Sequence, residues 1–209
     1  MITTVNFLLA GGEDTYINQT APDMNYAGSE FFVAGRFFGQ NIRSLHRVDL
    51  SGIIPAGSTI HSATYRPNCT GPAAPFTAIV FEELVDGWDY NEVTWNSKLT
   101  GVPWLFPGGD FYNGNEVNGL LPDVVGRASF GGFAAMVQEA IDNRAGKLIF
   151  LMRREIEAGG NSFAVFSSVA EADLGTAALL DVDFTPPTTV LSFERGQSRG
   201  MVRGMNRGS

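Results

Sequence analysis

Hydrophobic residues recur along this chain in short runs that are separated by clusters of Gly, Pro, Asn and Asp. Such runs predict β-strands bounded by turns. The run Phe76–Phe81 is apolar on both faces of the expected strand, as is typical of a strand in the interior of a sandwich. We expect eight strands, at Glu13–Asn18, Ser29–Ala34, Ile42–Leu50, Thr59–Arg66, Phe76–Leu84, Lys147–Arg153, Ser162–Ser168 and Ala177–Phe184. This pattern predicts an all-β protein, a jelly-roll β-sandwich.

One segment departs from the strand pattern. Its apolar residues stand at helical spacing and predict one short helix at the edge of the sandwich: Phe133, Met136, Val137, Ala140 and Ile141. Ser129 or Gly132 would open this helix, and Gly146 would close it. The stretch 99–126 is rich in Gly, Pro and Asn and predicts a long loop, which in a compact domain is often functional.

Composition narrows the class of protein. A chain of 209 residues with 44% hydrophobic residues suits one globular domain, which we expect over residues 1–187. The net charge of -8 argues against a general nucleic-acid binder, and no apolar run is long enough to span a membrane. Cys69 is the only cysteine, so an intramolecular disulfide is excluded. The N-terminus lacks a basic start and an apolar core, which predicts synthesis in a cytoplasm without a signal peptide.

Residues 188–209 differ in character from the rest and predict a linker followed by a basic Gly/Arg-rich arm. Four arginines recur at every fourth position: Arg195, Arg199, Arg203 and Arg207. The whole chain has 14 basic and 22 acidic residues. Without these four arginines and Glu194, the body has 10 basic and 21 acidic residues and a net charge of -11. Glycines with the same period disfavour a helix. The arm is either a solvated tail or a cationic segment that orders on an acidic partner.

Aromatic residues between positions 88 and 112 are candidates for a glycan platform, because a flat ring covers the apolar face of a sugar. The candidates are Trp88, Tyr90, Trp104, Phe106, Phe111 and Tyr112. The alternative is that these rings pack inside the protein, with each indole N–H bonded to a backbone carbonyl. For Trp95 we expect packing.

Several segments, in order, resemble the DNRLRE domain family, whose jelly-roll modules include members classed as carbohydrate-binding modules. They are Glu13–Ile17 with Asn25–Tyr26, Arg43–Ser51, Ile54–Ile60, Ser62–Thr64, Trp88 with Glu92–Asn96, and Ala135–Gln138. The resemblance covers residues 12–184 and implies a surface-exposed, non-catalytic β module. Family members are typically exported, whereas this chain lacks an export signal.

The resemblance also implies a structural calcium ion, which related modules hold where the chain ends meet. Glu13 and Asp14 open the first expected strand, and Asp181 and Asp183 lie in the last, so these four carboxylates are the candidate ligands. The alternative is that they are solvated. Each of the two histidines, His46 and His61, alternates along a strand and is expected to be a satisfied strand residue.

The sequence gives little support for an enzymatic function, and we expect no catalytic residue. Glu82 and Glu83 are adjacent on a strand and therefore face opposite ways. Glu92 could approach Asp86 or Asp89 across the turn, but a solvated acidic loop is the better explanation of these residues. The G-x-S-x-G match at 196–200 has no histidine after it.

Together these features predict a non-catalytic virion structural protein: a head decoration, fibre or tail component that leaves the cell by lysis. The basic arm would bind other virion proteins, the body would contact surface glycans weakly, and an oligomer is compatible with this role. The alternative is a stand-alone carbohydrate-binding or adhesion module at a cell surface, and a polysaccharide-active enzyme is a third hypothesis.

Overall fold

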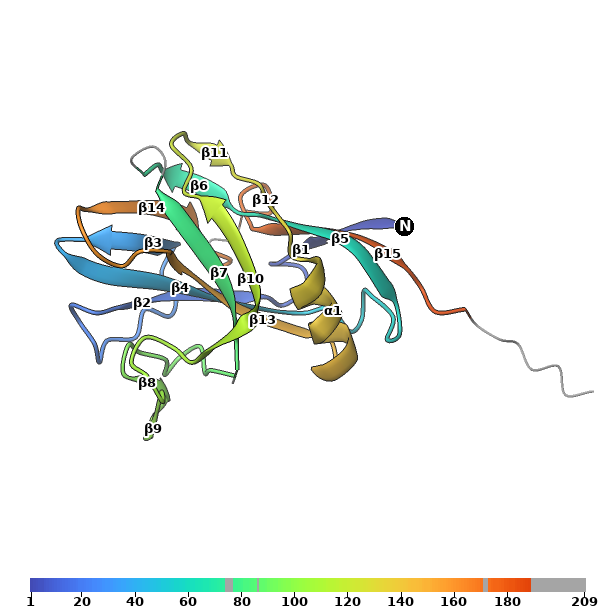
Figure 1. Cartoon of the computed structure of the whole chain (residues 1–209), viewed down its shortest axis with the longest axis horizontal. Helices are drawn as coiled ribbons and strands as arrows, with labels where there is room; N and C mark the ends of the chain where they lie inside the picture. Colours follow the sequence, from blue (N-terminus) through green and yellow to red (C-terminus); the bar gives the residue numbers. More distant parts are fainter. Residues whose placement is uncertain (74–76, 86, 171–172, 189–209) are drawn as a thin grey trace, which may run out of the picture.

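The computed structural model describes residues 1–73, 77–85, 87–170 and 173–188 of the chain. Figure 1 shows a body made almost entirely of strands, with one helix on its side. The strands are β1 (Ile2–Asn6), β2 (Glu13–Asn18), β3 (Phe31–Phe37), β4 (Gln40–Asp49), β5 (Thr59–Arg66), β6 (Asn68–Gly71), β7 (Ala78–Leu84), β8 (Ser97–Leu99), β9 (Val102–Pro103), β10 (Phe111–Leu120), β11 (Gly126–Arg127), β12 (Phe130–Gly131), β13 (Lys147–Arg154), β14 (Ser162–Ser167) and β15 (Leu179–Thr185). The helix is α1 (Ala134–Asn143).

Two antiparallel sheets form the sandwich. The larger has nine strands in the order β10-β7-β13-β4-β3-β14-β6-β11, with β2 paired to β4. The smaller has four strands in the order β1-β15-β5-β12, and β8 and β9 form a separate hairpin. Both sheets mix strands from distant parts of the chain, as in a jelly roll. The predicted all-β sandwich with one short helix is therefore confirmed.

The core between the sheets is built around Tyr65, which is completely buried. Its ring lies 5.2 Å from that of Phe150 and 5.7 Å from that of Phe133, both centroid to centroid. Apolar side chains come from both sheets because alternate residues of each strand face inward. Helix α1 adds four buried residues at helical spacing, Met136, Val137, Ala140 and Ile141, as predicted.

The helix α1 ends as predicted from the sequence, but it does not begin as predicted. Gly146 follows the helix with φ +85° and donates its N–H to the carbonyl oxygen of Ala140 at 2.7 Å, so it closes the helix as predicted. The predicted opening residues, Ser129 and Gly132, are wrong. Helix α1 begins after Phe133, which makes no side-chain cap hydrogen bond and whose ring is completely buried in the core.

All eight predicted strands are present in the described residues, with bounds that shift by a few residues. Seven further strands were not predicted, and most are short: β1, β6, β8, β9, β10, β11 and β12. Strand β10 lies within the stretch 99–126. The prediction that this stretch is a single irregular loop is therefore wrong.

The first and last strands are neighbours. β1 pairs with β15, and the N-terminal amine of Met1 donates to the Phe184 carbonyl oxygen at 2.7 Å. The predicted domain ends where β15 does, to within two residues. The predicted basic arm with Arg195, Arg199, Arg203 and Arg207 lies outside the described residues.

Candidate functional site

The outer face of the nine-stranded sheet is covered by the segment between β7 and β10. Three tryptophans of this segment are buried: Trp88, Trp95 and Trp104 are 2%, 6% and 4% exposed. They pack on Ile17, Leu45 and Leu151, which point outward from β2, β4 and β13. The segment thus forms a second, smaller apolar layer outside the sandwich.

Arginines of the sheet hold this layer in place. The guanidinium of Arg47 lies 4.9 Å from the ring of Trp88, and that of Arg43 lies 5.0 Å from the ring of Trp95. Arg153 lies 5.2 Å from the ring of Phe111. Each contact is a cation–π interaction within the usual range of distance.

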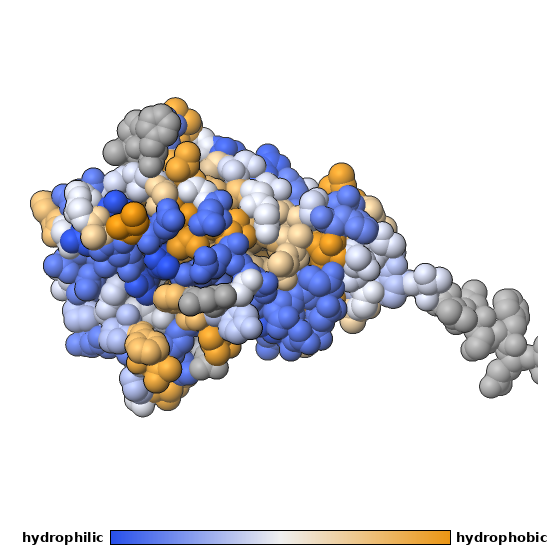
Figure 2. Space-filling view, viewed as in Figure 1, coloured by the Kyte–Doolittle hydropathy of each residue, from blue (hydrophilic) through white to orange (hydrophobic). Residues whose placement is uncertain are grey.

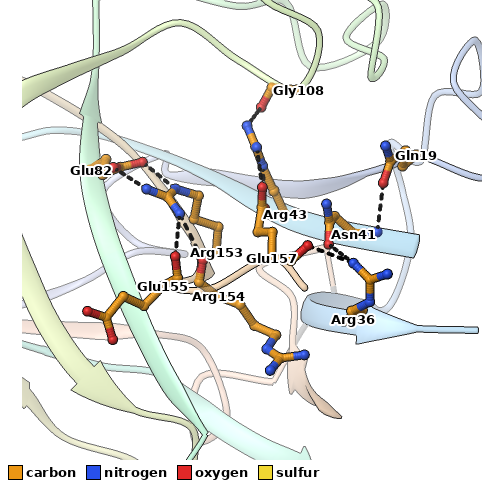
Figure 3. Close-up of polar contacts among 10 residues, drawn as sticks. All are labelled: Gln19, Arg36, Asn41, Arg43, Glu82, Gly108, Arg153, Arg154, Glu155 and Glu157. Carbon is orange, nitrogen blue, oxygen red and sulfur yellow. Dashed lines mark hydrogen bonds and ion pairs between the residues drawn. The ribbon is translucent and has the colours of Figure 1, made fainter. Parts of the chain in front are cut away.

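Carboxylates fix these arginines in turn, as Figure 3 shows for two of them. Arg43 donates to both carboxylate oxygens of Glu157, at 2.8 and 2.6 Å. Arg153 donates to both oxygens of the buried Glu82, each at 2.7 Å. Bidentate pairs of this kind are geometrically specific, so the covering segment rests on an ordered base.

The position of the aromatic candidates follows from this arrangement. Trp88 and Trp104 pack under the segment, and Tyr90 is half-buried with its hydroxyl oxygen accepting from the Gly28 N–H at 2.6 Å. Trp104 donates its indole N–H to the Thr94 carbonyl oxygen at 3.0 Å. The three tryptophans therefore pack inside the protein. The expected indole N–H to carbonyl bond is present for Trp104, whereas the indole N–H of Trp88 is buried without a hydrogen-bond partner among the described residues. A platform that includes Trp88 is wrong, because this ring is buried.

The exposed part of the segment is a pocket beside the β8–β9 hairpin, with a volume of about 700 Å³. We call it the β8–β9 pocket; it is lined by Val85, Lys98, Pro103, Trp104, Leu105, Phe106, Gly109, Asp110 and Phe111. Leu105 and Phe106 stand at its rim, 78% and 69% exposed. Figure 2 shows hydrophobic side chains gathered on this projection, at the bottom of the view. Three of the six aromatic candidates, Trp104, Phe106 and Phe111, thus meet in one place.

The rim of the pocket is held by backbone contacts. The carboxylate of Asp110 accepts from the N–H groups of Leu105 and Phe106, at 2.8 and 2.9 Å. Gly108 donates to the Trp95 carbonyl oxygen at 2.6 Å and has φ +98°. A Cβ at Gly108 would lie 2.8 Å from a guanidinium nitrogen of Arg43, so only glycine fits there. The pocket is therefore preformed.

Tyr112, the last aromatic candidate, is 58% exposed on β10, next to Phe111 but outside the lining of the pocket. The pocket itself offers apolar and aromatic walls with one cation, Lys98, and one carboxylate, Asp110. Such a mixture suits a ligand with an apolar face and polar edges.

The four proposed calcium ligands do not come together. Glu13 pairs with Arg47, Asp181 accepts from Arg66 and Thr4 at 2.7 and 2.6 Å, and Asp183 accepts from the N-terminal amine at 3.0 Å. Asp14 is buried against Ser168 and Val169. Among the described residues no group of three or more His, Cys, Asp or Glu side chains could hold a metal ion, so the prediction of one site from these four is wrong.

A buried polar network lies inside the sandwich, and its members are perturbed by burial. Desolvation raises the pKa of Asp14 to about 7, although hydrogen bonds from Ser168 and Val169 oppose it. Desolvation lowers the pKa of His46 to about 3. The two ring nitrogens of His46 contact the hydroxyls of Ser44 and Tyr65 at 2.9 and 3.3 Å.

This network is closed to substrate, because Ser44, His46 and Tyr65 have no exposed surface. His46 is a satisfied strand residue, as predicted, and so is His61, which contacts the Thr185 hydroxyl at 2.7 Å. The burial of Asp14 was not predicted. Asp14 on β2 pairs with the buried His46 on β4, so knowledge of the strand register would have predicted it.

Carboxylates that were considered for catalysis form ion pairs and hydrogen bonds within the fold. Glu82 and Glu83 face opposite ways, as predicted, and pair with Arg153 and Arg144. Glu92 accepts from the N–H of Thr100 at 2.7 Å. Asp86 lies outside the described residues.

Comparison with known proteins gives no family. No protein-family model matches the chain, and no curated protein matches it either. No helix of the described residues has the length and apolar character needed to cross a membrane. The resemblance to the DNRLRE domain family remains a prediction.

Proposed function

We propose that this chain is a non-catalytic structural protein of a virion, a head decoration, fibre or tail component that presents a binding surface. The observation that carries the proposal is the preformed β8–β9 pocket with Leu105 and Phe106 exposed at its rim. Apolar side chains that stay exposed around a preformed pocket are typical of a site of interaction.

Rigidity supports a binding role for this pocket. The segment around it rests on the arginine–aromatic layer and on the Asp110 hydrogen bonds. A surface that is already ordered loses little conformational freedom when it binds, which favours affinity. Many copies on one particle would strengthen weak single contacts through avidity.

Charge supports attachment through the C-terminal segment. The body carries a net charge of -11 and the last sixteen residues carry four arginines and one glutamate. β15 ends at the tip of the body opposite the β3–β4 hairpin, as Figure 1 shows. A basic segment that begins there can bind an acidic surface of other virion proteins while the opposite end faces outward.

One experiment tests this proposal. Particles released on lysis of producing cells are banded on a density gradient, and the full-length chain is followed with an antibody. We expect the chain to band with the particles, and a variant with alanine in place of Arg195, Arg199, Arg203 and Arg207 to remain in the soluble fraction. Lysine at the same four positions is the matched control and should restore banding. A wild-type chain that never bands with particles would overturn the proposal.

The second candidate is a stand-alone carbohydrate-binding or adhesion module. It is favoured by the lining of the β8–β9 pocket, where the rings of Phe106 and Phe111 lie beside Lys98 and Asp110. Binding of the full-length chain to a glycan array, lost in Phe106→Ala and without association with particles, would favour this candidate.

A further inference from the structure

The turn between β3 and β4 has an unusual residue in a demanding position. Phe37 pairs with Gln40, so the connection has two central residues, Phe38 and Gly39, with φ of +48° and +77°. This is the geometry of a type I′ turn, which prefers Asn followed by Gly. A phenylalanine in the left-handed region is disfavoured by its Cβ, and this one is also 77% exposed.

Neighbouring rings support Phe38. Its ring centroid lies 4.1 Å from that of Phe37, which lies 4.8 Å from that of Phe163 on β14. We call these three residues the aromatic turn. Gly35 allows β14 to approach, because a Cβ at this position would lie 2.4 Å from the Ser162 carbonyl oxygen. Phe38 is thus held outward by a packed base.

Groups that form hydrogen bonds surround the aromatic turn. The side-chain oxygen of Asn161 accepts from the Gly39 N–H at 3.0 Å, and its NH₂ group bonds to no residue that the structure describes. The side chain of Gln40 likewise has no hydrogen-bond partner within the described part of the chain. A guanidinium nitrogen of Arg36 lies 3.8 Å from the position of a Cβ on Gly39.

Arg36 is oriented toward this turn by its other contacts. It donates to the side chain of Asn41 at 3.2 Å and to the Glu157 carbonyl oxygen at 2.7 Å, as Figure 3 shows. The surroundings of Phe38 therefore offer planar donors and acceptors with fixed directions.

We propose that the aromatic turn is a binding site for a pyranose ring of a neutral carbohydrate. The apolar C–H face of the sugar packs on Phe38, and its hydroxyl groups exchange hydrogen bonds with Asn161, Gln40 and Arg36. A purely apolar partner would leave these polar groups dehydrated and unpaired, which is unfavourable. A small inorganic anion would make no use of the exposed ring.

This site is separate from the β8–β9 pocket and shares no residue with it. It lies at the end of the body farthest from the end of β15, as Figure 1 shows. The inference does not rest on the proposed function: a carbohydrate can bind here whether or not the chain belongs to a virion, and the test below requires no particle.

The test is a ¹⁵N NMR titration of the full-length chain with cellohexaose, maltohexaose and chitohexaose. We expect at least one of them to shift the backbone amide of Gly39 and the side-chain amide of Asn161. Phe38→Asn suits the type I′ turn and removes the ring, so it should fold and bind about tenfold more weakly, the effect of one lost aromatic contact. Phe38→Tyr keeps a ring face and should bind, and Phe106→Ala in the β8–β9 pocket should bind like the wild type.

Each other outcome overturns the inference. It fails if none of the three sugars shifts these amides at millimolar concentration, or if Phe38→Asn binds as tightly as the wild type. It also fails if the same amides shift with protein concentration alone, which indicates a second copy, or only with phosphatidylcholine vesicles, which indicates a lipid surface.

Discussion

Asp14 and His46 should give the stability of this protein two opposite dependences on pH. Both are buried, and they face each other across the register of β2 and β4. Burial raises the pKa of Asp14 from 3.8 to about 7 and lowers the pKa of His46 from 6.5 to about 3. A group whose pKa differs between the folded and unfolded states makes stability depend on pH.

The direction is opposite for the two groups. Folded Asp14 holds its proton up to a higher pH than unfolded Asp14, so its contribution is fully present below pH 3.8 and is lost as the pH rises toward 7. Folded His46 stays neutral where the unfolded chain is protonated, so its contribution is present above pH 6.5 and is lost as the pH falls toward 3. Between these limits the two slopes oppose each other.

The magnitude follows from the size of each pKa change. At about 1.4 kcal/mol per pH unit, Asp14 contributes about 4 kcal/mol and His46 about 5 kcal/mol across their windows. Between about pH 4 and 6.5 the two slopes cancel, so their sum should change little. In Asp14→Asn the free energy of unfolding should rise with pH, relative to wild type, by about 1.4 kcal/mol per unit. In His46→Gln it should fall with pH by a similar amount.

Urea unfolding at a series of pH values from 4 to 8, followed by tryptophan fluorescence, measures these profiles. Only the difference from wild type is compared, because other titrating groups contribute equally to all three proteins. The exposed Asp123 provides the control Asp123→Asn, which removes one surface carboxylate. Profiles of Asp14→Asn and His46→Gln that run parallel to wild type would refute the reasoning.

Three further predictions concern stability. Trp95→Ala should lower the free energy of unfolding by about 3 kcal/mol, because it empties a buried position of the outer apolar layer; an unchanged midpoint in urea would contradict this. Arg153→Ala should cost about 3 kcal/mol because it leaves the buried Glu82 without its partner, whereas Arg153→Ala combined with Glu82→Gln should recover part of that loss in the same assay. Phe38→Asn should raise the free energy of unfolding by about 1 kcal/mol, because asparagine tolerates the left-handed turn, and a loss of stability would show that the ring contacts outweigh the backbone cost.

The fold could be predicted to the extent that strands have regular patterns. The short apolar runs at β4 and β13 and the helical spacing of α1 identified elements that make the core. β10 was missed because its sequence, with Asn and Gly at several positions and an irregular register between Tyr112 and Val117, has low strand propensity. Its pairing with β7 is a tertiary effect that the local sequence does not carry.

The candidate site was predicted less well, for a physical reason. Alternation along β4 puts Arg43, Leu45 and Arg47 on one face, but it does not say what covers that face. The covering segment is held by contacts with arginines that are distant in sequence, so the burial of Trp88 could not be read from its neighbours. The aromatic turn had a local signal, the Gly39 that separates two strands, but the predicted strand ended at Ala34 and concealed it.

The pairing of β1 with β15 has a consequence for biosynthesis. β15 lies between β1 and β5, so the smaller sheet cannot close until the ribosome has made residues 179–185 and released them from its exit tunnel. Until then the smaller sheet leaves β1 unpaired and β5 with only the two-residue β12, and the core around Tyr65 lacks Leu180, Val182 and Phe184. The interior of the body therefore stays open during synthesis of residues 1–178, and the sandwich can close only after residue 185 has left the exit tunnel.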